Sequence, residues 1–134
     1  MVAISFSKRE NFPDLIRQGR KDQTIRPYNE RRFEQINRIK KLQLYWKQRT
    51  KECYKIADAE LTEILIIRFE LSGIYIWNEK IKYYERDWDK EKEIIKRDGF
   101  DNKLDFYRCF ENLYGNRLYD MEFMVIRWRL VKNG

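Results

Sequence analysis

The segment Phe123-Met124-Val125-Ile126-Arg127-Trp128-Arg129-Leu130 decides the fold class. Neighbouring side chains of a strand point to opposite faces, and here an apolar set alternates with a set that carries two arginines. Two helices are predicted immediately before this strand, so its pairing partners must lie far away in the sequence. Strands that pair across inserted helices are typical of an α+β fold.

Five earlier segments are also predicted to contain strands, with two more helices between them. The strands are expected at Ala3 to Ser7, at the end of Arg20 to Arg26, and at Leu42 to Lys47, Tyr54 to Leu71 and Ile74 to Trp77. The helices are expected from Asn11 to Gly19 and from Glu30 to Lys41. Because the outermost strands of an open sheet are left unpaired, we predict a small mixed β-barrel of about five or six strands with flanking and inserted helices. The 134 residues are expected to form one domain, 1–134.

Two helices are predicted before the last strand, and the first of them is dense in charges of both signs. The first, from Glu85 to Arg97, is predicted to contact the core through Trp88, Ile94 and Ile95. The second is predicted to begin at Asp101 and to end at Gly115, with a buried face made of Leu104, Tyr107, Phe110 and Leu113.

Composition excludes several kinds of chemistry. The chain has no histidine, which removes Ser-His-Asp catalysis and His-ligated zinc. Cys53 and Cys109 are far apart and are expected to be free buried thiols, with a disulfide or a reactive thiol as the alternatives. No metal or other cofactor is predicted. The longest apolar run, Ile64 to Ile67, is far shorter than a membrane span, so we expect no membrane association and a cytoplasmic location.

Positive charge is concentrated in the first part of the chain. Residues 1–55 hold 15 Lys and Arg against 6 Asp and Glu, whereas residues 56–134 hold 14 against 16. Aromatic residues lie among these cations, and the candidates for ligand contact are Tyr28, Tyr45, Trp46, Lys47 and Arg49. Cations neutralise phosphates and rings stack on bases, worth about 1–3 kcal/mol per base, which favours single-stranded RNA or a nucleotide as partner. The alternative is an ordinary solvated basic face.

The segment Gly19-Arg20-Lys21-Asp22-Gln23-Thr24-Ile25-Arg26 holds the densest chemistry. A turn at the glycine can bring Lys21, Thr24 and Arg26 to one cleft, with Gly19 and Arg20 beside it. A buried lysine between arginines has a lowered pKa, and its neutral amine could accept the proton of a Thr24 nucleophile. Arg26 would then hold a phosphate or an oxyanion. The alternative is a glycine-terminated helix followed by an exposed basic strand.

Asp98 is the acidic candidate for the same cleft. It precedes Gly99 at the end of a predicted helix. Beside Lys21, its carboxylate could orient the amine or act as a general acid or base. The alternative is an Asp-Gly turn without a chemical role.

These segments together resemble the ASCH domain family. The strongest element is the pattern Gly-x-Lys-x-x-Thr-x-Arg, met here by Gly19, Lys21, Thr24 and Arg26. The likeness covers nearly the whole chain and extends to Ile4-Ser5-Phe6, the Asp98-Gly99-Phe100 turn, the helix from Phe106 to Gly115 and the strand Val125-Ile126-Arg127-Trp128. It implies a PUA-like β-barrel whose cleft is lined by this motif, and a role in RNA binding.

The resemblance also implies two enzymatic alternatives. Some small bacterial members of the family are amidohydrolases that deacetylate N4-acetylcytidine with a Lys, a Thr and a Glu, and some members are reported as ribonucleases. Carried onto this chain, it implies Lys21 and Thr24 as catalytic residues and Asp98, one methylene shorter, as the acid. The chain is longer than those amidohydrolases because of Glu30 to Lys41 and Lys80 to Arg97, which could cover or reshape the cleft.

Four functions are therefore carried forward. RNA interaction through a basic cleft leads, and hydrolysis of an acylated pyrimidine nucleoside follows. RNA cleavage and a basic surface for an acidic protein partner are the remaining alternatives. The sequence does not identify a particular protein partner.

Overall fold

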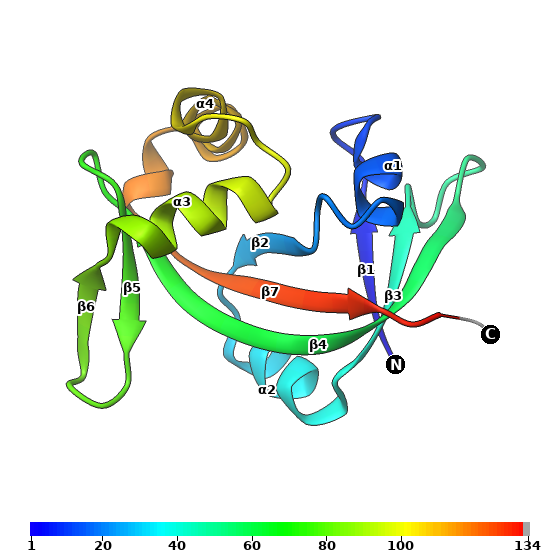
Figure 1. Ribbon diagram of the computed structural model, residues 1–134, viewed down its shortest axis with the longest axis horizontal. Coiled ribbons are helices and arrows are strands. Elements are labelled where there is room, and N and C mark those ends of the chain that lie inside the picture. The colour runs from blue at the N-terminus through cyan, green and yellow to red at the C-terminus, as the bar shows by residue number, and fades with distance from the viewer. Residues whose placement is uncertain (133–134) are drawn as a thin grey trace.

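A computed structural model describes residues 1–132 and shows a mixed α+β fold. Seven strands form one curled sheet within these residues: β1 (Val2–Phe6), β2 (Gln23–Pro27), β3 (Lys41–Trp46), β4 (Tyr54–Phe69), β5 (Ile74–Asn78), β6 (Tyr83–Arg86) and β7 (Glu122–Leu130). The helices are α1 (Phe12–Arg17), α2 (Glu30–Ile39), α3 (Trp88–Arg97), α4 (Lys103–Tyr114) and the 3-10 helix η1 (Gly115–Asp120). The α+β prediction is confirmed, and the sheet curls into a half-barrel (Figure 1).

Strand β4 organises the sheet because it pairs along both of its edges. It is 16 residues long, and it pairs antiparallel with β3 near its start and with β5 at its end. Strand β7 runs antiparallel along the other edge. The register slips between Leu44 and Tyr45 in β3 and between Leu61 and Glu63 in β4. Such bulges bend strands, and Figure 1 shows β4 as a long arc.

The curl brings the two outer strands β1 and β2 towards each other. Strand β1 pairs parallel with β3, and β2 pairs antiparallel with β7. Two guanidinium groups bond the free edge of β1 in place of a main-chain ladder: Arg26 Nη2 of β2 donates to Ser5 O at 2.7 Å, and Arg32 Nη2 of α2 donates to Ala3 O at 2.6 Å. Because an unpaired strand edge is a template for pairing, these arginines protect the free edge of β1.

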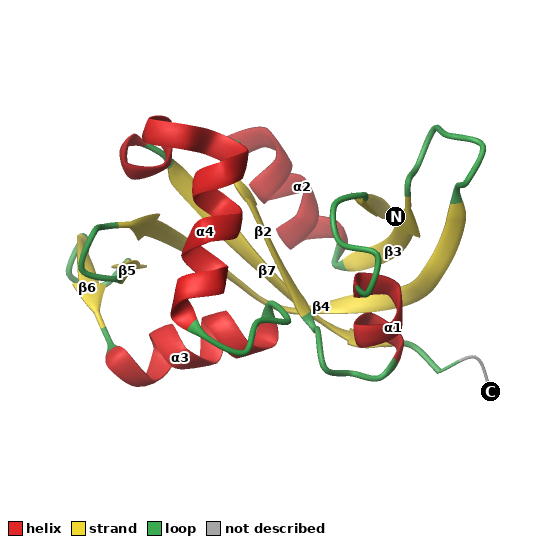
Figure 2. Cartoon of the chain, turned by 90° about the horizontal axis from the view of Figure 1, so that it is seen from above, coloured by secondary structure: helices red, strands yellow, loops and turns green. Residues whose placement is uncertain are grey.

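Two hydrophobic clusters lie on the two sides of the sheet. Inside the curl, side chains of β1, β3 and β7 pack with Ile16 of α1 and Ile36 of α2. The other cluster lies under α3 and α4, which cover the upper side of the sheet in Figure 1 and lie in front of it in Figure 2, while α2 lies below the sheet in Figure 1. Its centre is the Phe69 ring, 5.7 Å from that of Phe106 and 5.0 Å from that of Phe110. These rings bind α4 to β4, each pair contributing about 0.5–1.5 kcal/mol beyond its buried area.

The prediction of five or six strands was wrong by one strand, β6. It pairs with β5 at the edge of the sheet and lies in a segment dense in charge. Tyr83 at its start is 71% exposed. A short edge strand with little buried surface has no clear alternation of apolar and polar residues, and this is why the pattern missed it.

The late helices differ from the predictions in three details. Asn102 caps α4 by accepting from Asp105 N at 2.9 Å, so the predicted cap at Asp101 was wrong. Leu104 and Leu113 are exposed, and Phe106 faces the core in their place because it stacks on the Phe69 ring. Trp88 is also exposed, with the Arg86 guanidinium 3.6 Å from its ring centroid. No helix within residues 1–132 has both the length and the apolar character to cross a membrane.

Candidate functional site

The end of α1 delivers Lys21 into the interior. Gly19 has a φ of +75°, the left-handed conformation that commonly ends a helix. Leu15 O then accepts hydrogen bonds from both Arg20 N, at 2.9 Å, and Lys21 N, at 3.0 Å. The chain is thus held against the helix end, and the Lys21 side chain is left 1% exposed.

The buried Lys21 amine is paired with Asp98. Its Nζ lies 3.4 Å from Asp98 Oδ1 and donates to Asp98 O at 2.9 Å. The Phe12 ring centroid lies 4.3 Å from the same nitrogen, within cation–π range. Burial lowers the pKa of Lys21, opposed by the Asp98 carboxylate, and burial raises the pKa of Asp98, opposed by Lys21. Burial thus disfavours the charged form of each group, whereas the opposite charge of the partner favours it.

A tight turn at the end of α3 places Asp98. Asp98 N donates to Ile94 O at 3.1 Å, and Gly99 follows with a φ of +96°. A Cβ at Gly99 would lie 3.3 Å from Leu15 Cδ1 of α1. Glycine therefore allows the ends of α1 and α3 to approach closely, which brings together two residues 77 positions apart in the sequence.

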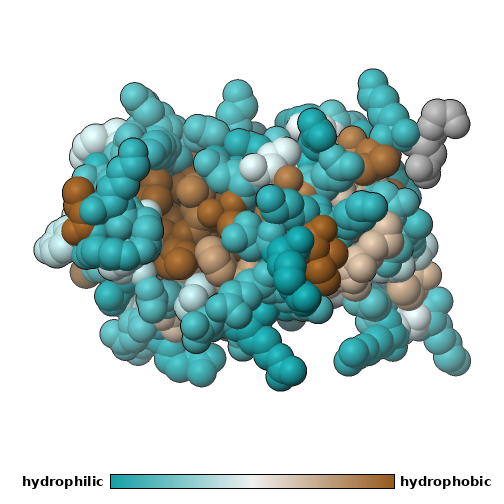
Figure 3. All heavy atoms as spheres, turned by 90° about the horizontal axis from the view of Figure 1, so that it is seen from below, coloured by the Kyte–Doolittle hydropathy of each residue, from teal (hydrophilic) through white to brown (hydrophobic). Residues whose placement is uncertain are grey.

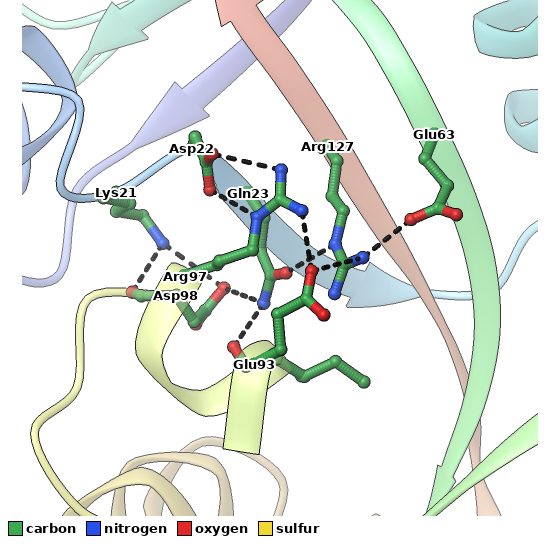
Figure 4. Close-up of polar contacts among 9 residues, drawn as sticks. Lys21, Asp22, Gln23, Glu63, Glu93, Arg97, Asp98 and Arg127 are labelled. Atoms are coloured by element: carbon green, nitrogen blue, oxygen red, sulfur yellow. Dashed lines mark hydrogen bonds and ion pairs between the residues drawn. The ribbon is translucent and has the colours of Figure 1, made fainter. Parts of the chain in front are cut away.

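Gln23 connects this pair to a larger polar network (Figure 4). Its Nε2 donates to Ile94 O at 2.6 Å and to Asp98 Oδ1 at 3.4 Å, and its Oε1 accepts from Arg127 Nε at 3.0 Å. Arg127 Nη1 in turn donates to Glu63 at 2.6 Å. Strands β2, β4 and β7 thereby fix the orientation of the Asp98 carboxylate.

A second part of the network ties α3 to the segment before β2. Arg97 Nε and Nη2 donate to the two carboxylate oxygens of Asp22 at 2.8 and 3.0 Å, and Arg97 Nη1 donates to Glu93 at 3.0 Å. Glu93 also lies 3.4 Å from Arg127 Nη1. This network was not predicted, because alternation along a strand does not identify a buried polar partner such as Gln23 or Arg127.

Thr24 lies in the same region but is bonded differently from the prediction. Its Oγ1 accepts from Arg26 Nε at 3.0 Å, and Arg26 also bonds Ser5 O of β1. Among the hydrogen bonds of residues 1–132, none joins Lys21 to Thr24. A hydroxyl that accepts from a guanidinium keeps its own hydrogen for donation. Thr24 can therefore still donate to a ligand or, through a ligand or water, to Lys21.

These side chains line one hollow of about 210 Å³, which we name the Lys21 pocket. Its polar members include Lys21, Thr24, Arg26 and Asp98, and its apolar walls include Phe6, Phe12, Phe100, Phe110 and Tyr114. The pocket is smaller than the roughly 300–1,000 Å³ of a site for a drug-sized ligand. It is therefore suited to a single small planar group held between rings.

Cys109 also lines the Lys21 pocket and is half-buried. Burial is the main cause that raises the pKa of its thiol, so Cys109 is present as the thiol. Cys53 is exposed, which contradicts the prediction of a buried thiol, and both cysteines are free. The aromatic walls and Cys109 were not predicted as site residues, because aromatic side chains at helical spacing indicate a core equally well.

The other predicted ligand residues lie outside the Lys21 pocket. Gly19 and Arg20 line a separate hollow beside α3. The centroid of the Tyr28 ring lies 5.7 Å from that of Phe33. Trp46 is 7% exposed in the core, so the faces of the Trp46 ring are not available to a base. Tyr45 and Lys47 bond Gln43 and Glu52, and Arg49 is exposed in the loop after β3. In the hydrogen-bonded sheet β4 and β7 lie between β3 and β2, and this separation explains why one basic stretch of sequence does not form one site.

No protein-family model matches the chain, and searches of curated proteins and of solved structures found no match. Across residues 1–132, no group of three or more His, Cys, Asp and Glu side chains is placed to hold a metal ion. Functional assignment therefore depends on the Lys21 pocket and its surroundings.

Proposed function

We propose that this protein interacts with single-stranded RNA and holds one base of the strand in the Lys21 pocket. The observation that carries the proposal is the convergence of four polar side chains and several aromatic rings on one hollow of about 210 Å³. The resemblance of the sequence to ASCH domains, which implies a PUA-like barrel and RNA binding, supports the same function.

The polar groups of the pocket complement the edge of a base. Lys21 and Arg26 are donors, the Asp98 carboxylate is an acceptor, and the Thr24 hydroxyl is both. Rings such as Phe12 and Tyr114 can pack on the faces of the base, and each stacked base contributes about 1–3 kcal/mol. An unpaired base is the part of RNA that presents both its edge and its faces.

A pair of cysteine variants tests the pocket. Cys109→Phe fills the Lys21 pocket, and Cys53→Phe adds the same ring to an exposed loop as the matched control. Affinity for a fluorescein-labelled single-stranded RNA of about eight nucleotides, a length within the range of small nucleic-acid-binding barrels, is measured by anisotropy over a salt series. We expect Cys109→Phe to weaken binding about tenfold, the loss of one base contact, and Cys53→Phe to bind like the wild type.

Two results would contradict the proposal. One is absence of wild-type binding at low salt, and the other is equal affinity of the two cysteine variants. Circular dichroism confirms that Cys109→Phe is folded, and the isosteric Thr24→Val, which removes one pocket hydroxyl, provides a second and milder variant. Gel analysis of the RNA after titration tests the ribonuclease alternative, since fragments would show cleavage.

Hydrolysis of an N-acylated pyrimidine nucleoside is the second candidate, and it is favoured by the buried Lys21 amine beside Thr24. Burial lowers the pKa of Lys21 and so favours its neutral form as a general base. The Thr24 hydroxyl would attack the acyl carbonyl and pass its proton through a water molecule to Lys21. The resulting ammonium would protonate the departing nucleoside amine, leaving an ester on Thr24 that water hydrolyses. Asp98 would orient the amine, and Arg26 would stabilise the oxyanion.

Incubation with N4-acetylcytidine tests this candidate. Release of cytidine, followed by chromatography, is expected from the wild type and is expected to be lost in Thr24→Val and Lys21→Met. Thr62→Val is the matched control, because Thr62 is exposed on β4. Equal rates in Thr24→Val and Thr62→Val would refute the assigned nucleophile.

A further inference from the structure

A second and larger hollow adjoins the Lys21 pocket. It has a volume of about 990 Å³ and lies between α2 and the strands β1 and β2, and we name it the α2 groove. Its charged lining consists of four arginines and one carboxylate: Arg26, Arg31, Arg32, Arg38 and Glu34. The face of the molecule on which α2 lies is mostly hydrophilic, with several apolar areas between the polar residues (Figure 3). The groove is therefore suited to an anionic ligand.

The four arginines divide into a fixed pair and a free pair. Arg26 and Arg32 donate to the carbonyls of β1 and are held in place. Arg31 and Arg38 are exposed, and within the described residues neither has an ion-pair or hydrogen-bond partner of its side chain. They are seven residues apart, so they lie on one face of α2 about two turns, or about 10 Å, from each other. Two free cations at this spacing can each contact a phosphate of an extended strand.

The free edge of β1 argues against an extended peptide in this groove. A peptide that adds to a sheet edge bonds the main-chain groups of that edge. The carbonyls of Ala3 and Ser5 already accept from Arg32 and Arg26. An added strand would have to displace both guanidinium groups.

The α2 groove and the Lys21 pocket are neighbours. Ser5 and Arg26 line both of them, and Arg26 Nη2 donates to Ser5 O where the two hollows meet. A strand with one base in the pocket would pass this hydrogen bond to reach the groove. We propose that the α2 groove binds the phosphates of the nucleotides next to the base in the pocket, and that the ligand is a single-stranded oligonucleotide and not a free nucleoside. This inference rests on the proposed function. It means that α2 makes the protein bind an oligonucleotide strand more tightly than a single nucleoside.

Charge removal in α2 tests the inference. Arg31→Gln/Arg38→Gln is compared with Lys90→Gln/Lys92→Gln, which removes two exposed cations from α3, a helix of the same length. Each phosphate contact to a single strand contributes about 0.7 to the slope of log affinity against log salt, so the α2 variant should lose about 1.4 from this slope. The fall in RNA affinity between about 50 and 200 mM salt then becomes about sevenfold smaller. Affinity for cytidine, measured by NMR titration, should be unchanged.

The outcomes separate the groove from the pocket. Equal slopes in the α2 and α3 variants would overturn the inference, and if Cys109→Phe still weakened RNA binding, the proposed function would stand. A reduced slope with an unaffected Cys109→Phe would support the phosphate contacts and overturn the base pocket. Competition by a polyglutamate peptide as effective as that of unlabelled RNA would also overturn the inference, because the groove would then accept an acidic peptide.

Discussion

The Lys21 pocket and the α2 groove share Arg26 and yet hold positive charge in opposite ways. In the pocket, Lys21 is 1% exposed, paired with Asp98 and surrounded by rings. In the groove, the side chains of Arg31 and Arg38 are exposed to solvent. A buried charge interacts strongly but only in one geometry, whereas exposed charges act at longer range and are screened by salt. The comparison indicates that the pocket provides selectivity and the groove provides electrostatic attraction.

The largest expected effect comes from breaking the buried pair. Lys21→Met keeps most of the side-chain volume but leaves Asp98 without its cation, so we expect a loss of about 3–5 kcal/mol in the free energy of unfolding. Urea denaturation measures this loss. Lys90→Met, at an exposed position of α3, should stay within about 0.5 kcal/mol of the wild type.

The double variant Lys21→Met/Asp98→Asn provides the control for this interpretation. It removes the unpaired charge, and we expect it to recover part of the stability that Lys21→Met loses. If Lys21→Met alone were as stable as the wild type, the pair would not be the buried interaction described here.

The turn that carries Asp98 should be more sensitive than the turn that carries Lys21. Both glycines have positive φ, but a Cβ would be crowded by Leu15 only at Gly99, and nothing lies within 4 Å of one at Gly19. We expect Gly99→Ala to cost about 3 kcal/mol and Gly19→Ala about 1 kcal/mol. Thermal and urea unfolding measure the difference, and equal costs would show that the close approach of α1 and α3 is unimportant.

The pH dependence of stability should report the same pair. The folded pKa of Lys21 lies below 10.5, so the unfolded chain binds more protons between that lowered value and 10.5, and stability rises with pH across this window. The folded pKa of Asp98 lies above 3.8, so the folded chain binds more protons between 3.8 and the raised value, and stability falls as pH rises there. Each slope reaches at most about 1.4 kcal/mol per pH unit. Both should be absent from Lys21→Met/Asp98→Asn, and parallel profiles of this variant and the wild type would contradict the assignment.

The smallest expected effect on stability belongs to the groove. Arg31 and Arg38 have no partner in the described part of the chain, so Arg31→Gln/Arg38→Gln should change the free energy of unfolding by no more than about 0.5 kcal/mol. Denaturation of this variant at low and high salt tests the expectation. A loss of several kcal/mol would mean that these arginines support the fold, which would remove the contrast with Lys21.

Much of the fold could be predicted because strands and helices with one buried face repeat their apolar residues regularly. This holds for β1, β3, β4 and β7, whose ranges agree with the predicted segments within a few residues. The repeat of apolar residues did not predict elements with little buried surface, such as β6. It also did not predict the cap of α4 or which face of α4 is buried. The Asn102 cap is a local feature one residue from the predicted Asp101. Phe69, the ring on which Phe106 packs, is remote in the sequence and can be identified as a partner of α4 only from the tertiary structure.

Only the polar residues of the candidate site were predicted from the sequence. Lys21, Thr24, Arg26 and Asp98 line one pocket, because glycines at positions 19 and 99 allow the two turns to meet. Its aromatic walls come from segments whose rings look like ordinary core residues in the sequence. Only composition indicates the basic stretch around Lys47 and Arg49 as a ligand-binding segment. Composition does not show which side of a curled sheet a loop will occupy. The repeat of Arg31 and Arg38 on one face of a predicted helix was the available signal for the groove.

Nuclear Overhauser contacts between the protein and a bound RNA of about eight nucleotides test the central claim most directly. We expect the protons of one base to contact the rings of Phe12, Phe100 and Tyr114, while ribose protons of neighbouring nucleotides contact Arg31 and Arg38 of α2. Base protons that contact only exposed residues, with none at the Lys21 pocket, would contradict the account.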